Sequence, residues 1–168
     1  TKWLGRTALL LCCLVCFKIG QYVVNSESTV AGAASSKTIH GLTYEPFDPI
    51  VALQHVRNGK NVFIDYTAVW WAVCKTNEQF VLHTKEVSEK IKELGIIPMI
   101  ADQSDKDNWI LSEFLDKLEQ QTIPFYPIIL GSKEGKIEEL PNQLSPPATT
   151  PEAGKKKFIK KLEELLKS

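Results

Sequence analysis

The chain has 168 residues, which is enough for one ordinary domain with an additional segment but too few for two full domains. Its 20 Lys and Arg residues balance its 20 Asp and Glu residues, so the formal net charge is zero. A protein that binds nucleic acid through charge needs a basic surplus to displace counterions, so we expect no nucleic-acid partner. Hydrophobic residues make up 43% and charged residues 24%, which excludes a chain that is disordered throughout.

The first segment of the chain is strongly apolar. Ala8–Phe17 contains only apolar residues, and the longer stretch Trp3–Val24 reaches the roughly 20 residues that cross a bilayer. Arg6 and Lys18 lie near its ends, where long cationic side chains reach the lipid headgroups. Residues 1–24 are therefore either a transmembrane anchor or a signal peptide, and the length of the span favours the anchor. Both interpretations place the rest of the chain outside the cytoplasm.

Three of the four cysteines, Cys12, Cys13 and Cys16, lie inside this apolar segment. Such a cluster is no disulfide framework, because a framework needs cysteines spread along the chain. We interpret the C-x-x-C spacing of Cys13 and Cys16 as apolar packing rather than as a redox pair. Cys74 is then the only thiol in the rest of the chain.

Residues 25–42 are rich in Ser, Thr, Ala and Gly and predict a linker, followed by a folded domain over residues 43–168. A short leading strand is expected over Ile39–Tyr44. Asp48 and Pro49 are typical of an N-cap and of the first helical position, and Asn58-Gly59 would end that helix.

The apolar run Val62–Tyr66 predicts a strand that is covered on both faces. A helix is expected from about Cys74 to Gly95, with a kink at His83-Thr84. Ile96–Ala101 predicts the next strand, in which Pro98 indicates a strand start or a sheet edge.

The remaining elements alternate in the same way. Asp107 is expected to cap a helix whose apolar side includes Phe114 and Leu115, and Phe125–Leu130 is a predicted strand. Lys136–Leu140 would return from a turn at residues 131–135 as the second half of a hairpin, and Thr150-Pro151 would open a final helix. This order predicts an α/β fold in which a mixed central sheet has helices on both faces.

The segment Asp65–Lys75 resembles the thioredoxin signature D-x-x-A-x-W-C-x-x-C-K at its Asp, Ala, Trp, second Cys and Lys. Together with Thr76-Asn77-Glu78 it is similar to the C-terminal periplasmic domain of the thiol:disulfide interchange protein DsbD family. Ile123–Pro127 resembles that family's segment around its cis-proline. The resemblance implies a thioredoxin-like fold preceded by a transmembrane helix at residues 3–24. It also implies a bacterial inner-membrane location with the domain in the periplasm, and periplasmic thiol or disulfide proteins as partners.

The sequence departs from the family at the reactive position, because the family's first, nucleophilic cysteine falls on Trp71. Dithiol exchange needs one thiolate to attack and a second thiol, three residues later, to resolve the mixed disulfide. Trp71 has no nucleophile, and Cys74 alone cannot close a disulfide within the domain. We therefore expect the dithiol reaction to be absent, leaving at most a monothiol reaction with a partner or with glutathione.

The other site residues each have two interpretations. Asp65 resembles the family's buried acid that moves a proton to or from the second cysteine, or it is a carboxylate with local hydrogen bonds at the end of a strand. Glu78 matches an acidic position of the family. We favour the other interpretation, in which Glu78 is a surface charge that pairs with Lys75. Trp70 and Trp71 form either an exposed platform for binding or a pair packed on the helix.

By the resemblance, Pro124 is the family's cis-proline, and we expect it to be cis and, with Ile123, to line the site. His40, His55 and His83 lack the spacing of metal ligands, so no metal and no other cofactor is expected. Three functions stay open: a thiol:disulfide interchange module with a degenerate site, a non-catalytic module that binds extended polypeptide segments through strand addition, and a structural cap on a membrane assembly.

Overall fold

The computed structural model describes residues 35–104, 109–120 and 122–167, which belong to one compact unit over residues 34–168. The predicted anchor at residues 3–24 and the predicted cap Asp107 lie outside the described residues. None of the helices described here is long and apolar enough to span a membrane.

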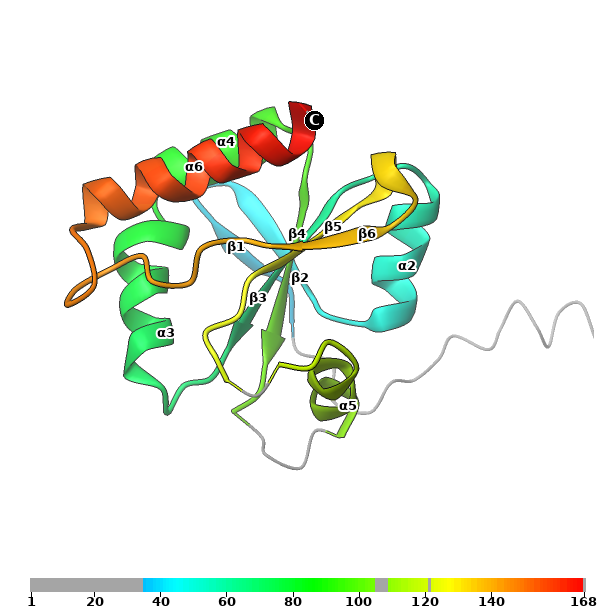
Figure 1. The fold of residues 1–168 in the computed structure, drawn as a ribbon, viewed down its shortest axis with the longest axis horizontal. Helices are drawn as coiled ribbons and strands as arrows, with labels where there is room; N and C mark the ends of the chain where they lie inside the picture. Colours follow the sequence, from blue (N-terminus) through cyan, green and yellow to red (C-terminus); the bar gives the residue numbers. More distant parts are fainter. Residues whose placement is uncertain (1–34, 105–108, 121, 168) are drawn as a thin grey trace, which may run out of the picture. The chain divides into compact units, whose positions relative to one another are not determined.

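A mixed sheet runs through the unit in the order β1-β2-β4-β3-β5-β6 (Figure 1). β4 pairs in parallel with both β2 and β3, whereas β5 pairs antiparallel with β3 and with β6, and β1 pairs antiparallel with β2. The strands are β1 Lys37–Ile39, β2 Leu42–Pro46, β3 Val62–Thr67, β4 Ile97–Asp102, β5 Pro127–Leu130 and β6 Lys136–Glu139.

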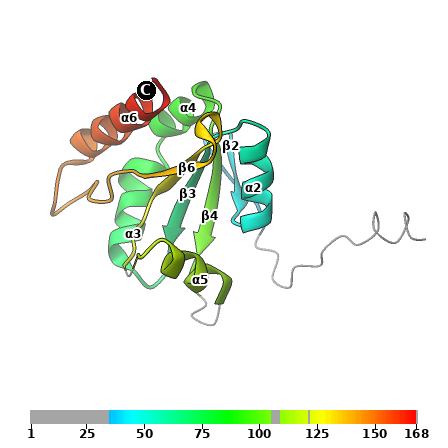
Figure 2. The ribbon, with the colours of Figure 1, turned by 45° about the vertical axis from the view of Figure 1, so that its right-hand side comes forward.

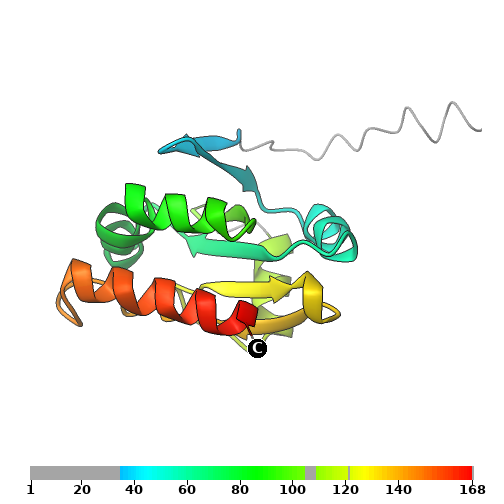
Figure 3. The ribbon, with the colours of Figure 1, turned by 90° about the horizontal axis from the view of Figure 1, so that it is seen from above.

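Helices cover both faces of this sheet, as predicted. The helices are α2 Pro49–Arg57, α3 Ala72–Asn77, the π-helix η1 Glu78–Leu82, α4 Lys85–Glu93, α5 Trp109–Lys117, the 3-10 helix η2 Gly131–Lys133 and α6 Pro151–Lys167. Figure 2 shows α3, α4 and α6 on one side of β3 and β4, with α2 on the other. Figure 3 shows α4 and α6 running side by side, where Lys90 Nζ lies 3.1 Å from Glu163 Oε1.

Two apolar cores lie on the two faces of the sheet, and β3 contributes to both. Phe63 belongs to the core under α4 and α6, whereas Ile64 and Tyr66 belong to the core under α2 and α5. This alternation follows from the two-residue period of a strand. All six residues of β3 are buried, which confirms the prediction of a strand covered on both faces.

The predicted start and end of the first helix are confirmed. Asp48 Oδ1 accepts hydrogen bonds from Ile50 N at 2.7 Å and Val51 N at 3.0 Å, and Pro49 is the first helical residue. At the other end, Gly59 takes a φ of 73°, a conformation that glycine adopts without a steric penalty.

One expectation needs correction, and another is confirmed in part. The leading strand is a hairpin rather than one strand, because His40 and Gly41 both have positive φ and reverse the chain between β1 and β2. Among the described residues, regular structure consequently starts at Lys37, inside the range 25–42 expected to be a linker. Pro98 is the second residue of β4, so it lies near the start of a strand as expected, but β4 is an interior strand and not a sheet edge. The ladder between β2 and β4 begins only at Met99, so the missing N–H of Pro98 removes no hydrogen bond from that ladder.

Candidate functional site

The predicted site lies where β3 ends and α3 begins. We call residues 69–73, which connect the end of β3 to the first turn of α3, the tryptophan loop. Val69 N donates to Ser104 Oγ at 2.8 Å, and Trp71 N donates to Ala68 O at 3.2 Å. The first hydrogen bond holds the loop beside the residues that follow β4, and the second closes a turn at the start of the loop. The loop is therefore positioned at the carboxyl ends of two parallel strands, where α/β folds commonly bind ligands.

The tryptophan loop exposes apolar side chains. Trp70 is 49% exposed and Trp71 is 42% exposed, and their rings make an edge contact with centroids 6.0 Å apart. Val69 and Val73 are also exposed. Four apolar side chains gathered on one exposed loop are typical of a surface that binds another molecule. The arrangement favours the platform interpretation of Trp70 and Trp71 over indoles packed against the helix.

Cys74 lies beneath this loop and has no exposed surface. Its Sγ points toward Tyr66 O at 4.0 Å. The pKa of the Cys74 thiol is raised to about 11, chiefly by burial and also by the charge of the nearby Asp65, whereas a hydrogen bond with the backbone of Ala68 acts in the opposite direction. A thiol that is protonated and shielded is a poor nucleophile.

A cluster of charged side chains lies beside Cys74. Asp65 is completely buried, and its Oδ2 lies 3.3 Å from His83 Nε2. On the other side of the imidazole, Nδ1 lies 3.8 Å from Glu78 Oε2. Glu78 also accepts a short hydrogen bond from Thr67 Oγ1, and its Oε1 lies 2.7 Å from Lys75 Nζ. The pairing of Glu78 with Lys75 was predicted, but Glu78 is largely buried rather than a surface charge.

Burial raises the pKa of Asp65, and the charge of Glu78 raises it further, whereas the hydrogen-bonding interaction with His83 lowers it. Apart from this contact with His83, the Asp65 carboxylate accepts no hydrogen bond from a described residue, so its burial carries a cost in free energy. Burial therefore disfavours the charged form of Asp65 in the folded chain.

Sequence reasoning missed His83 as a member of this cluster and identified it only as part of a kink. The π-helix η1 places it there, because His83 N donates to Glu78 O at 2.8 Å and adds a residue to the turn. A single π turn leaves no distinct pattern in a sequence. Within the described residues, no group of three or more His, Cys, Asp and Glu side chains is arranged to hold a metal ion.

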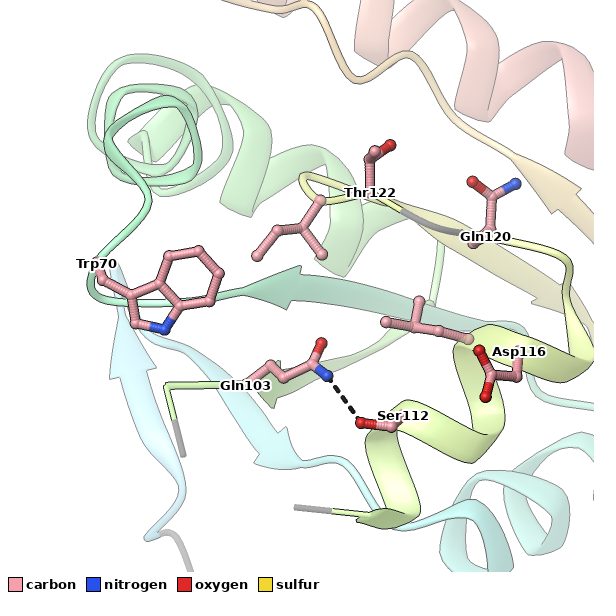
Figure 4. A pocket seen from close by; sticks show the side chains of 8 residues that line it. Trp70, Gln103, Ser112, Asp116, Gln120 and Thr122 are labelled. Atoms are coloured by element: carbon pink, nitrogen blue, oxygen red, sulfur yellow. Dashed lines mark hydrogen bonds between the residues drawn. The ribbon is translucent and has the colours of Figure 1, made fainter. Parts of the chain in front are cut away.

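The segment around Pro124 lies next to the end of β3. The Ile123–Pro124 peptide bond is cis, as predicted. Tyr66 N donates to Phe125 O at 3.1 Å, which holds this segment beside β3. Ile123 and Trp70 both line one pocket of about 460 Å³, shown in Figure 4, so the structure brings these two predicted binding residues together.

Comparison with known proteins defines the fold. No protein-family model matches the chain, and no curated protein matches it. Among solved structures, a DsbH oxidoreductase is 18% identical with a TM-score of 0.56, covering 85% of this chain and 93% of that one. A thioredoxin from Thermus thermophilus is 17% identical with a TM-score of 0.54, covering 73% and 86%. The oxidised C-terminal domain of Neisseria meningitidis DsbD is 18% identical with a TM-score of 0.50, covering 71% and 97%.

These likenesses show that the chain has a thioredoxin-like α/β fold, as predicted. Function does not follow from a fold, so it has to be argued from the site. In this chain the site combines an exposed tryptophan pair with a buried, single cysteine.

Proposed function

We propose that this chain is a DsbD-type thioredoxin-like domain in which the dithiol reaction is lost and the site binds extended polypeptide segments of periplasmic thiol or disulfide proteins. The observation that carries the proposal is the burial of Cys74 behind a tryptophan loop that has an indole in place of the attacking thiol. The tryptophans remain available for contact with a partner, whereas the sulfur does not.

The dithiol reaction is expected to be lost because it needs two protein thiols and the site has one. In dithiol exchange, one thiolate attacks a substrate disulfide and releases one substrate thiolate, and a second protein thiolate then displaces the other. The substrate gains two electrons and the protein is left with an internal disulfide. At pH 7 a thiol with a pKa of about 11 is ionised in roughly one molecule in ten thousand. Cys74 would also need a second thiol from outside the domain to resolve any mixed disulfide, which argues against a monothiol reaction as well.

Two features at and beside the pocket lined by Trp70 and Ile123 support the proposed binding surface. The tryptophan loop offers exposed apolar area. In the segment before Pro124, the backbone N–H and C=O of Ile123 take part in none of the hydrogen bonds between described residues. An extended segment could pair with this backbone by strand addition and place its side chains against Trp70 and Trp71.

The same proposal includes the location of the protein. The apolar stretch Trp3–Val24 would anchor the chain in the bacterial inner membrane, with the thioredoxin-like domain in the periplasm. The support is the length of the stretch and the position of its two cationic residues near the ends. A reporter that folds only in the periplasm, fused after Ser168, should be active, and a cytoplasmic reporter at that position should be inactive. The reverse pattern would exclude the location.

The loss of catalysis is tested by insulin reduction with the purified 168-residue chain in a neutral detergent. We expect the unmodified chain and its Cys74→Ser variant to give the same background rate with dithiothreitol. Trp71→Cys restores two thiols three residues apart and should raise the rate, and Trp71→Cys combined with Cys74→Ser should return it to background. An unmodified chain that matches Trp71→Cys, and loses its rate in Cys74→Ser, would refute the proposal.

Binding is tested with extended peptides by isothermal titration calorimetry. The double variant Trp70→Ala/Trp71→Ala should weaken binding at least tenfold, because aromatic side chains dominate the energy of such contacts. Phe80→Ala is a matched control, since Phe80 is an equally exposed aromatic residue, 44% exposed, that lies outside the tryptophan loop. Equal losses in both variants would contradict a binding role for the loop.

A further inference from the structure

The pocket beside the tryptophan loop has a lining that the proposed function does not explain. It measures about 460 Å³, which is within the range of pockets that hold small ligands or partner side chains. Its described walls come from three separate parts of the chain: the tryptophan loop, the end of β4 with helix α5, and the segment before Pro124 (Figure 4). The described lining residues are Trp70, Gln103, Ser112, Leu115, Asp116, Gln120, Thr122 and Ile123.

The polar part of this lining offers several hydrogen-bond acceptors. Gln103 Nε2 uses one of its two N–H donors on Ser112 Oγ at 3.1 Å, and the carbonyl oxygen of the same amide is an acceptor that a ligand could use. Thr122 and Gln120 add further oxygens from the opposite wall (Figure 4). Among the described lining residues, Asp116 is the only one with a formal charge, and that charge is negative.

The carboxylate of Asp116 has no counter-ion within the described residues. Lys117, its neighbour on α5, is paired with Glu113, with Lys117 Nζ 2.8 Å from Glu113 Oε1. Asp116 itself is exposed and takes part in no side-chain hydrogen bond or ion pair between described residues. A pocket that holds an indole, several acceptor oxygens and a carboxylate without a counter-ion among the described residues is complementary to a cation that carries many donors.

We propose that this pocket binds an arginine side chain of the extended segment that the proposed function places along Ile123, so the inference rests on that proposed function. A guanidinium group fits for three reasons. Its planar face stacks on an indole such as Trp70. Its five N–H donors match the acceptor oxygens, and its charge pairs with the Asp116 carboxylate. The apolar side chains of Leu115 and Ile123 cover the aliphatic stem of the arginine.

The test compares two peptides that differ in charge only. One extended peptide carries a single arginine, and the other carries citrulline, a neutral side chain of nearly the same shape. Each is titrated into the purified 168-residue chain in neutral detergent by isothermal titration calorimetry. We expect the arginine peptide to bind about fivefold to tenfold more tightly, with a difference that shrinks at high salt, since exposed charge pairs are screened.

Two variants assign that difference to the pocket. Asp116→Asn should bring the two peptides to equal affinity, whereas Glu113→Gln, which removes an exposed carboxylate from the same helix outside the pocket lining, should keep the preference for arginine. Both substitutions are at exposed positions, so the fold should be unaffected.

The outcomes separate the two proposals. Equal binding of both peptides to the unmodified chain, or a preference that survives in Asp116→Asn, overturns the arginine pocket and leaves the binding module intact. If neither peptide binds, N-acetyl-arginine amide and N-acetyl-citrulline amide are titrated alone while the NMR signal of the Trp70 indole N–H is followed. A shift with the arginine compound only, lost in Asp116→Asn, supports the pocket and refutes the binding of extended segments. No shift overturns both.

Discussion

Replacing Asp65 by asparagine should make the folded chain more stable at neutral pH. Asp65 is completely buried, and burial together with the charge of Glu78 raises its pKa above the ordinary value of 3.8. Between the ordinary pKa and the raised one, the folded chain holds a proton that the unfolded chain has released. The free energy of unfolding therefore decreases as the pH rises through this window, by up to about 1.4 kcal/mol per pH unit.

The magnitude of the expected gain follows from the same relation. Once the pH is above the raised pKa, the ionised carboxylate has cost the fold about 1.4 kcal/mol for each pH unit between the two pKa values. The amide of the Asp65→Asn variant would keep the shape of the protonated acid without this cost. Below the ordinary pKa, both states of the unmodified chain are protonated, so Asp65→Asn should then change the stability little.

The assay is urea unfolding of both proteins at several pH values between 3 and 8. The readout is the difference in the free energy of unfolding between variant and unmodified chain. His83 and Glu78 are the titratable side chains that lie closest to this position in the folded chain. Asp116→Asn is the control, because it removes an exposed carboxylate and should show a difference near zero at every pH. A difference for Asp65→Asn that does not change with pH, or a variant less stable than the unmodified chain at pH 7, would refute this reasoning.

Three further predictions concern the packing of the site and of the last helix. Asn77→Ala should lower the stability by about 3 kcal/mol in a urea titration, because Asn77 Nδ2 donates to Tyr126 Oη at 3.0 Å and its loss leaves buried partners unsatisfied. Gly154→Ala should cost a similar amount in the same titration, about 3 kcal/mol, since its new Cβ would clash with the backbone carbonyl of Leu144. Cys74 should react with a thiol reagent at least 100-fold more slowly than a free thiol until urea unfolds the chain, and rapid labelling of the native chain would contradict its burial.

The sequence predicted those parts of the fold that depend on local patterns. The apolar run of β3 favours a buried strand, and Asp48-Pro49 favours the start of α2. Each depends on a few adjacent residues, and both predictions are confirmed. The turn at His40-Gly41 was missed because the residues around it also suit one continuous strand. The position of Pro98 depends on where the neighbouring strand begins to pair, which is a property of the sheet and not of Ile96–Ala101.

In the candidate site, too, the sequence predicted the local features and missed those that depend on the folded structure. The motif Asp65–Lys75 predicted which residues meet at the end of β3, because they are close in sequence and share one strand-to-helix connection. His83 enters the cluster only through a π turn, and Asp116 reaches the pocket only because α5 packs on the sheet near the tryptophan loop. Neither a single π turn nor a contact between segments far apart in the chain leaves a local pattern in the sequence.

The most direct test of the central claim, that this site has no working dithiol, is the oxidation state of Cys74 in the native chain. The purified 168-residue chain is equilibrated in glutathione buffers from reducing to oxidising, alkylated under denaturing conditions after an acid quench, and mapped by peptide mass spectrometry. We predict that Cys74 is recovered as a free thiol across the whole range, because it is buried and has no partner cysteine in the described residues. Recovery of Cys74 in a disulfide that forms and is reduced reversibly in the folded chain would contradict this account.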